Sequence, residues 1–176
     1  EMEQLDLERV RCLDAKGWYE FLRDKYFRWK YTAANRYATT TGYLRRYEKP
    51  GALDELHRIK ERLLAIDRSD VDSALKTACE IHGLGPPGAS GLLALMYPDA
   101  FGTVDQFVVK ALRDVPDLPE APQLTSMKPK GLRPKDGVLL IGIMRRKAAE
   151  NNRVFGADAW TPRKIDKVLW TYGRHQ

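Results

Sequence analysis

The residues best suited to chemistry lie in the run Ile81-His82-Gly83-Leu84-Gly85-Pro86-Pro87-Gly88-Ala89. A Gly-hydrophobic-Gly sequence between two helices predicts a tight hairpin, because glycine adopts positive φ and lets the backbone approach a partner closely. We expect Leu84 to point inward and hold the two helices together. The first amides of the second helix would then face outward, in a geometry that binds phosphate. A plain helical hairpin with no ligand has the same pattern.

Asp105 is the second residue of interest, because it stands eighteen residues after Pro87 and immediately before an apolar helix. That helix carries Val108, Val109 and Leu112 at helical spacing. An aspartate in this position is a natural N-cap, and capping alone would stabilise the fold by about 1 kcal/mol. The residue type and position therefore allow a purely structural role as well as a chemical one.

Together, the run 81–89 and the pair Val104-Asp105 resemble the helix-hairpin-helix DNA glycosylase superfamily, of the endonuclease III and adenine-glycosylase type. The family pattern is hydrophobic-Pro-Gly-hydrophobic-Gly, two variable residues, Thr-Ala, an apolar helix and then hydrophobic-Asp. The likeness covers about 45 of the 176 residues.

The resemblance implies that Asp105 is the catalytic aspartate, whose carboxylate stabilises positive charge on the deoxyribose as the base leaves. It also implies a hairpin that contacts DNA phosphate through Gly83, Leu84, Gly85, Gly88 and Ala89. Where bifunctional members of the family carry a Schiff-base lysine, this chain has Pro87. We therefore expect no lyase chemistry through that residue, but a monofunctional glycosylase that hydrolyses an N-glycosidic bond of a damaged or modified base without a cofactor.

Two further differences from the family pattern affect phosphate binding. Pro86 and Pro87 lack amide hydrogens, which removes two donors. His82 replaces the usual proline, and we expect it to be packed or to face a phosphate.

Apolar residues recur at three- and four-residue spacing in almost every segment, so we expect an all-α fold. The resemblance implies a helix-hairpin-helix glycosylase-like bundle with two lobes and a cleft between them. We expect a single domain over 1–176, with one lobe from 1–49 plus 121–176, a central hairpin lobe over 50–115 and a Pro-rich connector over 116–136.

Two details of the helices can be predicted. The apolar run Val138–Ile143 has no second strand to pair with, so it predicts the buried start of a helix that extends to about Asn151. In the last helix, Thr161 is the expected N-cap, Pro162 fits the first position and Gly173 is expected to end it.

The net charge of +6 is distributed unevenly, with +6 over residues 16–49, −5 over 50–120 and +8 over 121–176. If the two basic ends pack together, they form a positive face for a polyanion, and double-stranded DNA is the expected partner. Scattered solvating charges are the alternative. Phosphate contacts are expected from Lys128, Lys130, Arg133, Arg145, Arg146 and Arg163.

Ten of the seventeen aromatic residues lie between 18 and 47, interleaved with basic residues. Enzymes that act on a flipped base hold it between such side chains, although a large helix with buried rings has the same composition. Five residues lie off the buried stripe or beside the hairpin and are our candidates for a pocket wall: Tyr31, Asn35, Arg36, Tyr37 and His82.

Several classes are excluded or unsupported. Two cysteines, Cys12 and Cys79, cannot form a disulfide scaffold, a four-cysteine zinc site or a cysteine-ligated iron–sulfur cluster. The histidines have no neighbouring ligands, so we expect no metal. No apolar run is long enough to span a membrane, and Glu1-Met2-Glu3 does not begin a secretory signal. We expect a protein of the cytoplasm, nucleoid-associated in a bacterium, or of the nucleus.

Two rival functions remain open from the sequence. One is a non-catalytic module that binds DNA or a protein through the same hairpin, with Asp105 retained as a cap. The other is an interaction module with no nucleic-acid role, which the loss of two hairpin amides would favour.

Overall fold

The computed structural model describes residues 2–175, apart from the side chain of residue 4, and these residues form helices and loops with no strand. The all-α prediction is therefore confirmed. In chain order the elements are η1 (Met2–Gln4), α1 (Leu7–Arg11), α2 (Ala15–Phe21), η2 (Leu22–Tyr26), α3 (Phe27–Lys30), α4 (Ala34–Leu44), η3 (Arg45–Glu48), α5 (Ala52–Leu64), α6 (Val71–Cys79), α7 (Pro86–Met96), α8 (Gln106–Arg113), α9 (Ala121–Ser126), α10 (Pro134–Phe155) and α11 (Pro162–Arg174).

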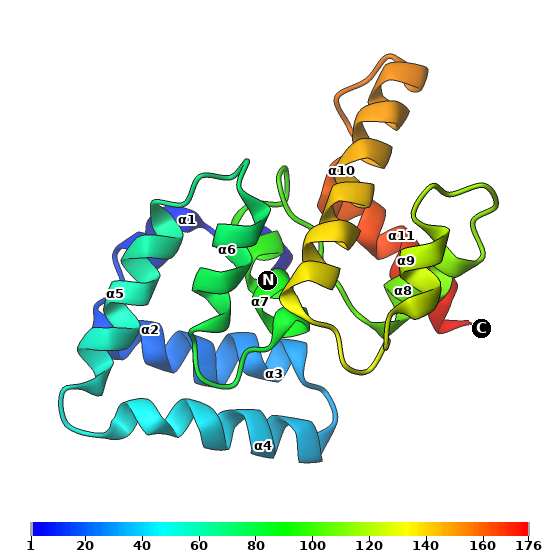
Figure 1. Ribbon diagram of the computed structural model, residues 1–176. Helices are drawn as coiled ribbons and strands as arrows, with labels where there is room; N and C mark the ends of the chain where they lie inside the picture. The colour runs from blue at the N-terminus through cyan, green and yellow to red at the C-terminus, as the bar shows by residue number, and fades with distance from the viewer. Residues whose placement is uncertain (1, 176) are drawn as a thin grey trace.

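Figure 1 shows α1–α7 gathered on one side of the molecule and α8, α9 and α11 on the other, with α10 between them. Helix α10 packs against α6, α7 and α11, and α8 lies along α11. The loop Phe101–Asp105 leads from the first group of helices to the second. Asp105 is consequently placed where the two groups meet.

The predicted grouping of segments differs from this arrangement. Residues 1–49 do not pair with 121–176 as one unit, because α2 packs against α5 and α3 against α4. The expected 50–115 lobe is also divided, since α8 packs against α11. Contacts that do join the two ends of the chain include Glu3 and Trp29, both against Arg163.

Two predicted segments are changed in detail. The run Val138–Ile143 is helical as expected, but α10 already begins at Pro134 and continues to Phe155. The Pro-rich connector contains the short helix α9. The Arg113 side chain of α8 holds this helix by donating to the carbonyl groups of Leu124 and Met127, at 2.9 and 2.7 Å.

The prediction that Gly173 ends the last helix is wrong, because α11 continues to Arg174. Gly173 lies buried in the final turn of that helix. A Cβ on Gly173 would overlap the carbonyl oxygen of Phe107 and lie 3.2 Å from the Ala111 nitrogen, both in α8. The glycine is required there because the backbones of α8 and α11 approach each other closely. A tertiary contact, and not a helix stop, explains this residue.

We predict that Gly173→Ala lowers the free energy of unfolding by about 1–3 kcal/mol, because α8 and α11 must separate to admit the methyl group. Gly42→Ala is the matched control, since Gly42 is also helical and a Cβ there meets nothing within 4 Å. It should raise stability by about 0.5–1 kcal/mol. Urea denaturation measures both values, and equal stabilisation of the two variants would contradict the assignment.

Candidate functional site

The predicted hairpin lies between α6 and α7. Gly83 has a φ of +95°, in the left-handed region that favours glycine. Leu84 is buried, as expected for a residue that holds the two helices together. His82 donates its backbone N–H to the hydroxyl of Tyr47, and its ring stacks on the Tyr47 ring at 4.7 Å between centroids.

The close approach that the hairpin glycines allow is largely internal to the chain. A Cβ on Gly83 would lie 2.5 Å from the carbonyl oxygen of Thr40, and a Cβ on Gly88 would overlap the Tyr31 hydroxyl. Gly85, in contrast, is exposed and faces open space. Of the glycines that we expected to approach an outside partner, Gly85 alone has room around its Cα.

The backbone amides also show which hairpin residues are free to contact a phosphate. Ala89 donates its N–H to the Gly85 carbonyl at 2.8 Å, and both Gly88 and Ala89 are buried. These two residues are therefore wrong as phosphate contacts. The N–H groups of Gly83 and Gly85 have no acceptor among the described residues. Any phosphate at this turn would be held by those two donors.

Asp105 is the N-cap of α8 and is half-buried. One carboxylate oxygen, Oδ1, accepts from the backbone N–H groups of Phe107 and Val108, at 2.8 and 3.0 Å. The other oxygen, Oδ2, has no donor among the described residues. The capping prediction is confirmed, and the cap leaves half of the carboxylate uncommitted.

Ser90 connects the hairpin helix to Asp105. Its buried hydroxyl accepts the Val104 backbone N–H at 3.0 Å and donates to the Pro87 carbonyl at 3.3 Å. Because Val104 directly precedes Asp105, this pair of hydrogen bonds fixes the aspartate relative to the first turn of α7. The loop that leads to Asp105 is thus hydrogen-bonded to the hairpin helix.

The loop before Asp105 is also held from the side of α11. Thr103 donates its backbone N–H to Asp166 Oδ2 at 2.6 Å and accepts from Arg163 at 3.0 Å. Arg163 additionally pairs with Asp166, at 2.8 Å, and with Glu3. Burial raises the pKa of Asp166 to about 6, against the opposing effect of the Arg163 charge.

Three of the expected phosphate contacts are committed to the protein itself. Arg163 is buried within the cluster just described, so its assignment to DNA is wrong. Arg145 donates to the carbonyl groups of Ala100, Arg68 and Ser69. Arg146 pairs with Glu120. Side-chain donors used to hold backbone or carboxylate groups are not free for a phosphate.

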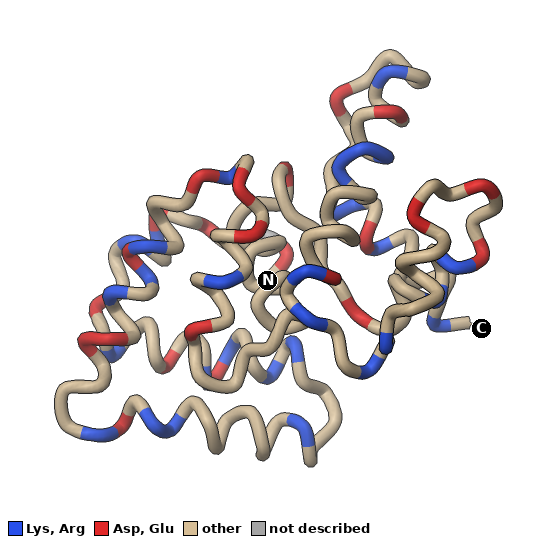
Figure 2. Tube along the Cα trace, in the orientation of Figure 1, with Lys and Arg blue, Asp and Glu red and all other residues tan. Residues whose placement is uncertain are grey.

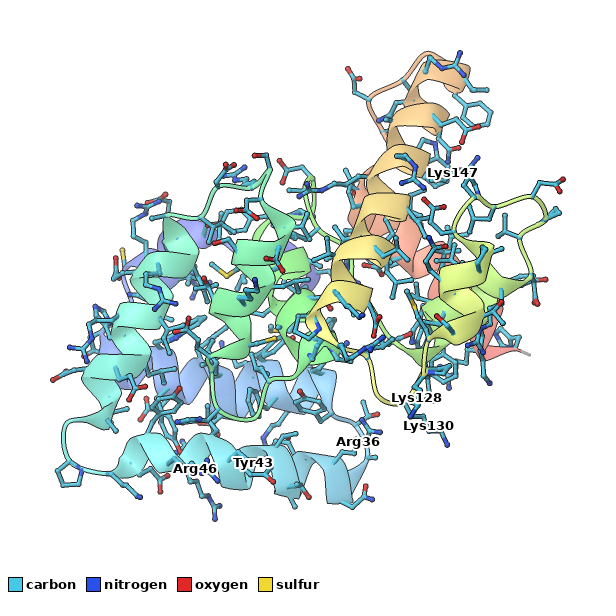
Figure 3. All side chains as sticks on the ribbon, viewed as in Figure 1. Arg36, Tyr43, Arg46, Lys128, Lys130 and Lys147 are labelled. Atoms are coloured by element: carbon cyan, nitrogen blue, oxygen red, sulfur yellow. The ribbon has the colours of Figure 1, made fainter. Side chains whose placement is uncertain are left out.

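The remaining three basic candidates lie at the surface before α10. Arg133 is exposed and pairs with Asp136, whose carboxylate also accepts the backbone N–H of Arg133 at 2.9 Å. Lys128 and Lys130 are exposed and form no ion pair with any described residue. Figure 2 shows basic positions along this loop, near the start of α4 and in η3, and Figure 3 shows Lys128, Lys130 and Arg36 along the same edge of the view.

The expected pocket residues are not gathered around one cavity. Tyr31 lies over the hairpin, where its hydroxyl donates to the Gly83 carbonyl at 3.2 Å, and burial raises its pKa to about 12. Asn35 and Arg36 line a surface hollow on α4 together with two threonines. The Tyr37 ring lies under the Arg28 guanidinium, at 5.1 Å. Asp105 does not line that hollow.

One residue beside α7 was not among the predicted site residues. Lys30, the last residue of α3, lies across α7, where a Cβ on Gly91 would be 3.4 Å from its Nζ. Burial lowers the pKa of Lys30 to about 8, and the charges of Asp105 and Asp166 oppose that shift. The basic run around Lys30 was visible in the sequence, but the close approach of Lys30 to Gly91, 61 positions away, was not.

No protein-family model matches this chain, and the comparisons with curated proteins and with solved structures also give no match. Among the described residues, no helix is long and apolar enough to cross a membrane. No group of three or more histidine, cysteine, aspartate or glutamate side chains in that part of the chain could hold a metal ion. The site must therefore be interpreted from its own geometry.

We predict that Ser90→Ala lowers the free energy of unfolding by about 1–3 kcal/mol, because the buried Val104 N–H loses its acceptor. Ser73→Ala, at an exposed position of α6, is the control and should change stability by less than about 0.5 kcal/mol. Chemical denaturation of both variants checks the expectation. A Ser90→Ala protein as stable as the wild type would show that the hydroxyl does not hold the loop.

Proposed function

We propose that this protein binds double-stranded DNA through its helical hairpin and hydrolyses an N-glycosidic bond with Asp105. The observation that carries the proposal is the uncommitted Oδ2 of Asp105, on a residue that Ser90 fixes relative to the hairpin helix. A carboxylate held in this way can stabilise positive charge that develops on a sugar ring. The motif resemblance supports the same chemistry.

The hairpin would contribute phosphate binding. The N–H groups of Gly83 and Gly85 precede α7, whose N-terminus carries a partial positive charge. Gly85 is exposed and unobstructed, so a phosphate oxygen can reach its amide. A DNA backbone held here would place a sugar near the first turn of α7 and hence near Asp105.

Asp105 would act after binding. As the C1′–N bond breaks, the sugar gains oxocarbenium character, and a fixed anion lowers the energy of that transition state. The same oxygen can accept a hydrogen bond from the attacking water and direct it to C1′. The two amides on Oδ1 keep the carboxylate in position without occupying Oδ2.

We predict that Asp105→Asn lowers the rate of abasic-site formation by at least about a hundredfold, because the negative charge is lost while the amide oxygen still caps α8. The measurement is strand cleavage at abasic sites after incubation with a panel of duplexes, each with one damaged or modified base. Asp70→Asn is the matched control, since Asp70 caps α6 through the Ser73 N–H at 3.0 Å. Its rate should equal that of the wild type.

Equal rates for the Asp105 and Asp70 variants would remove Asp105 from the chemistry. Binding of duplex DNA without product from any base in the panel would instead favour the non-catalytic DNA-binding module.

We also predict that the double substitution Lys128→Gln and Lys130→Gln reduces the slope of log affinity against log salt concentration by about 2, because each lysine would neutralise one phosphate. The control is Lys147→Gln with Arg153→Gln, which removes the same charge from two exposed positions in the second half of α10. Figure 3 labels Lys147. The slope of that control should be unchanged. Fluorescence anisotropy of a labelled duplex at several salt concentrations compares the two, and equal slopes would exclude the loop before α10 from the interface.

A further inference from the structure

Helix α4 is an outer helix of the fold, and most of its residues are exposed to solvent. It packs mainly against α3 and η3, and within it only Thr41 and Leu44 are buried. Figure 1 shows α4 along the lower edge of the view, beneath α2 and α3. The outer side of this helix is therefore open to a partner.

The charge around α4 has a single sign. Residues 25–47, which include the whole helix, contain six basic residues and no carboxylate. The acidic residues that border this segment are already engaged, because Asp24 pairs with the arginine before it at 2.7 Å and Glu48 accepts from the Tyr19 hydroxyl at 2.6 Å. Four arginines of the segment are exposed and form no ion pair with any described residue: Arg28, Arg36, Arg45 and Arg46.

Helix α5 shows what an ordinary solvated helix of this protein looks like. It carries Asp54, Glu55 and Glu61 among its basic residues, and Glu61 lies 3.1 Å from the Nζ of Lys60. Mixed charge of this kind is sufficient to keep a helix in water. The unmixed positive charge around α4 is instead complementary to a polyanion.

Three side chains in the first turns of α4 suit the recognition of base edges. The Arg36 guanidinium has no hydrogen-bond partner among the described residues, and its fork matches the O6 and N7 acceptors of guanine. Asn35 accepts the Arg36 backbone N–H through Oδ1, at 2.8 Å, and keeps its Nδ2 donors. The Thr39 hydroxyl donates to the Asn35 carbonyl at 2.9 Å, which leaves its methyl group for a thymine methyl.

The shape of the outer face allows close approach. Ala38 is exposed and small, and a Cβ on Gly42 would meet nothing within 4 Å. A helix about 10–12 Å in diameter fits a major groove about 12 Å wide. Arg45 and Arg46 follow the end of α4 in η3, where they can reach phosphates at the edge of the groove, and Figure 3 labels Arg36 and Arg46 near the two ends of this surface.

We propose that α4 enters the major groove of double-stranded DNA and reads base edges there, with Arg36 as the residue that recognises guanine. The proposal rests on the proposed function only in taking duplex DNA as the partner, since it needs no base excision. The hairpin adjoins this helix, because a Cβ on Gly83 would lie 2.5 Å from the Thr40 carbonyl oxygen. Hairpin amides that hold a phosphate carry no sequence information, and α4 supplies it.

The test begins with a pool of duplexes that contain a randomised segment. The full chain is incubated with this pool, and the bound duplexes are recovered and sequenced. We expect the wild type to enrich a short preferred sequence with a guanine that is favoured by about tenfold over the other bases at its position. In Arg36→Ala the discrimination at that one position should fall at least about fivefold.

Two variants separate base reading from charge. Arg58→Ala removes an exposed arginine of α5 that forms no ion pair with a described residue, and it should leave the base preference unchanged. Arg45→Gln with Arg46→Gln should weaken binding to every sequence and reduce the slope of log affinity against log salt concentration by about 2, with the same base preference.

Chemical probing of the wild type is a second measurement that needs no variant. Dimethyl sulfate methylates guanine N7 in the major groove and adenine N3 in the minor groove. On the preferred duplex, the bound protein should protect the guanine N7. Protection confined to adenine N3 would overturn the proposal, because the protein would then occupy the minor groove.

The other outcomes are equally decisive. A pool with no enriched sequence, or a preference that Arg36→Ala retains, would overturn the reading of bases by α4. Single-stranded DNA or RNA that displaces the duplex more strongly than unlabelled duplex does would also overturn it. An enriched sequence without abasic-site formation on any base would reject the hydrolysis but retain α4, whereas abasic-site formation with no preferred sequence would do the reverse.

Discussion

The loop Phe101–Asp105 is clamped between α7 and α11, and the arrangement of the candidate site depends on that clamp. Ser90 holds Val104 from one side, while Asp166 and Arg163 hold Thr103 from the other. All of these groups are buried, where a hydrogen bond lost without replacement is costly. The clamp therefore holds the loop that carries Asp105 against the hairpin helix. It leaves the Oδ2 atom of Asp105 without a hydrogen bond from the described residues.

The clamp also shows that some of the basic residues serve the fold itself. Arg163 and Arg145 are cations whose donors satisfy carboxylates and carbonyl groups inside the fold. Part of the positive charge at the C-terminal end of the chain thus stabilises loops and is not offered to a polyanion. The charge that remains free lies on exposed lysines such as Lys128 and Lys130, in the loop between α9 and α10 (Figure 3).

Helix α7 is the element that contacts each part of the candidate site. Its start forms the hairpin, Ser90 reaches forward to the loop before Asp105, and Gly91 receives Lys30 from α3. These contacts join the hairpin, the loop before Asp105 and the end of α3 at one helix. A single rigid helix with small residues at successive positions can position groups from several distant segments, since close-packed interiors transmit position accurately.

The sequence by itself determined the features that arise within a few residues. Apolar periodicity indicated the helices, Thr161 and Asp105 were identifiable as caps, and the glycines at 83 and 85 marked the hairpin. It could not show that Gly88 accommodates Tyr31, that Gly173 accommodates α8, or that Arg163 is buried. Nor could it show that Lys30 lies against Gly91 of α7. Those outcomes depend on which apolar faces pack together and on the space left between them, and such contacts join residues far apart in the chain. Only the tertiary structure decides them, because local spacing carries the information for hydrogen bonds within one turn and none about the partner across the core.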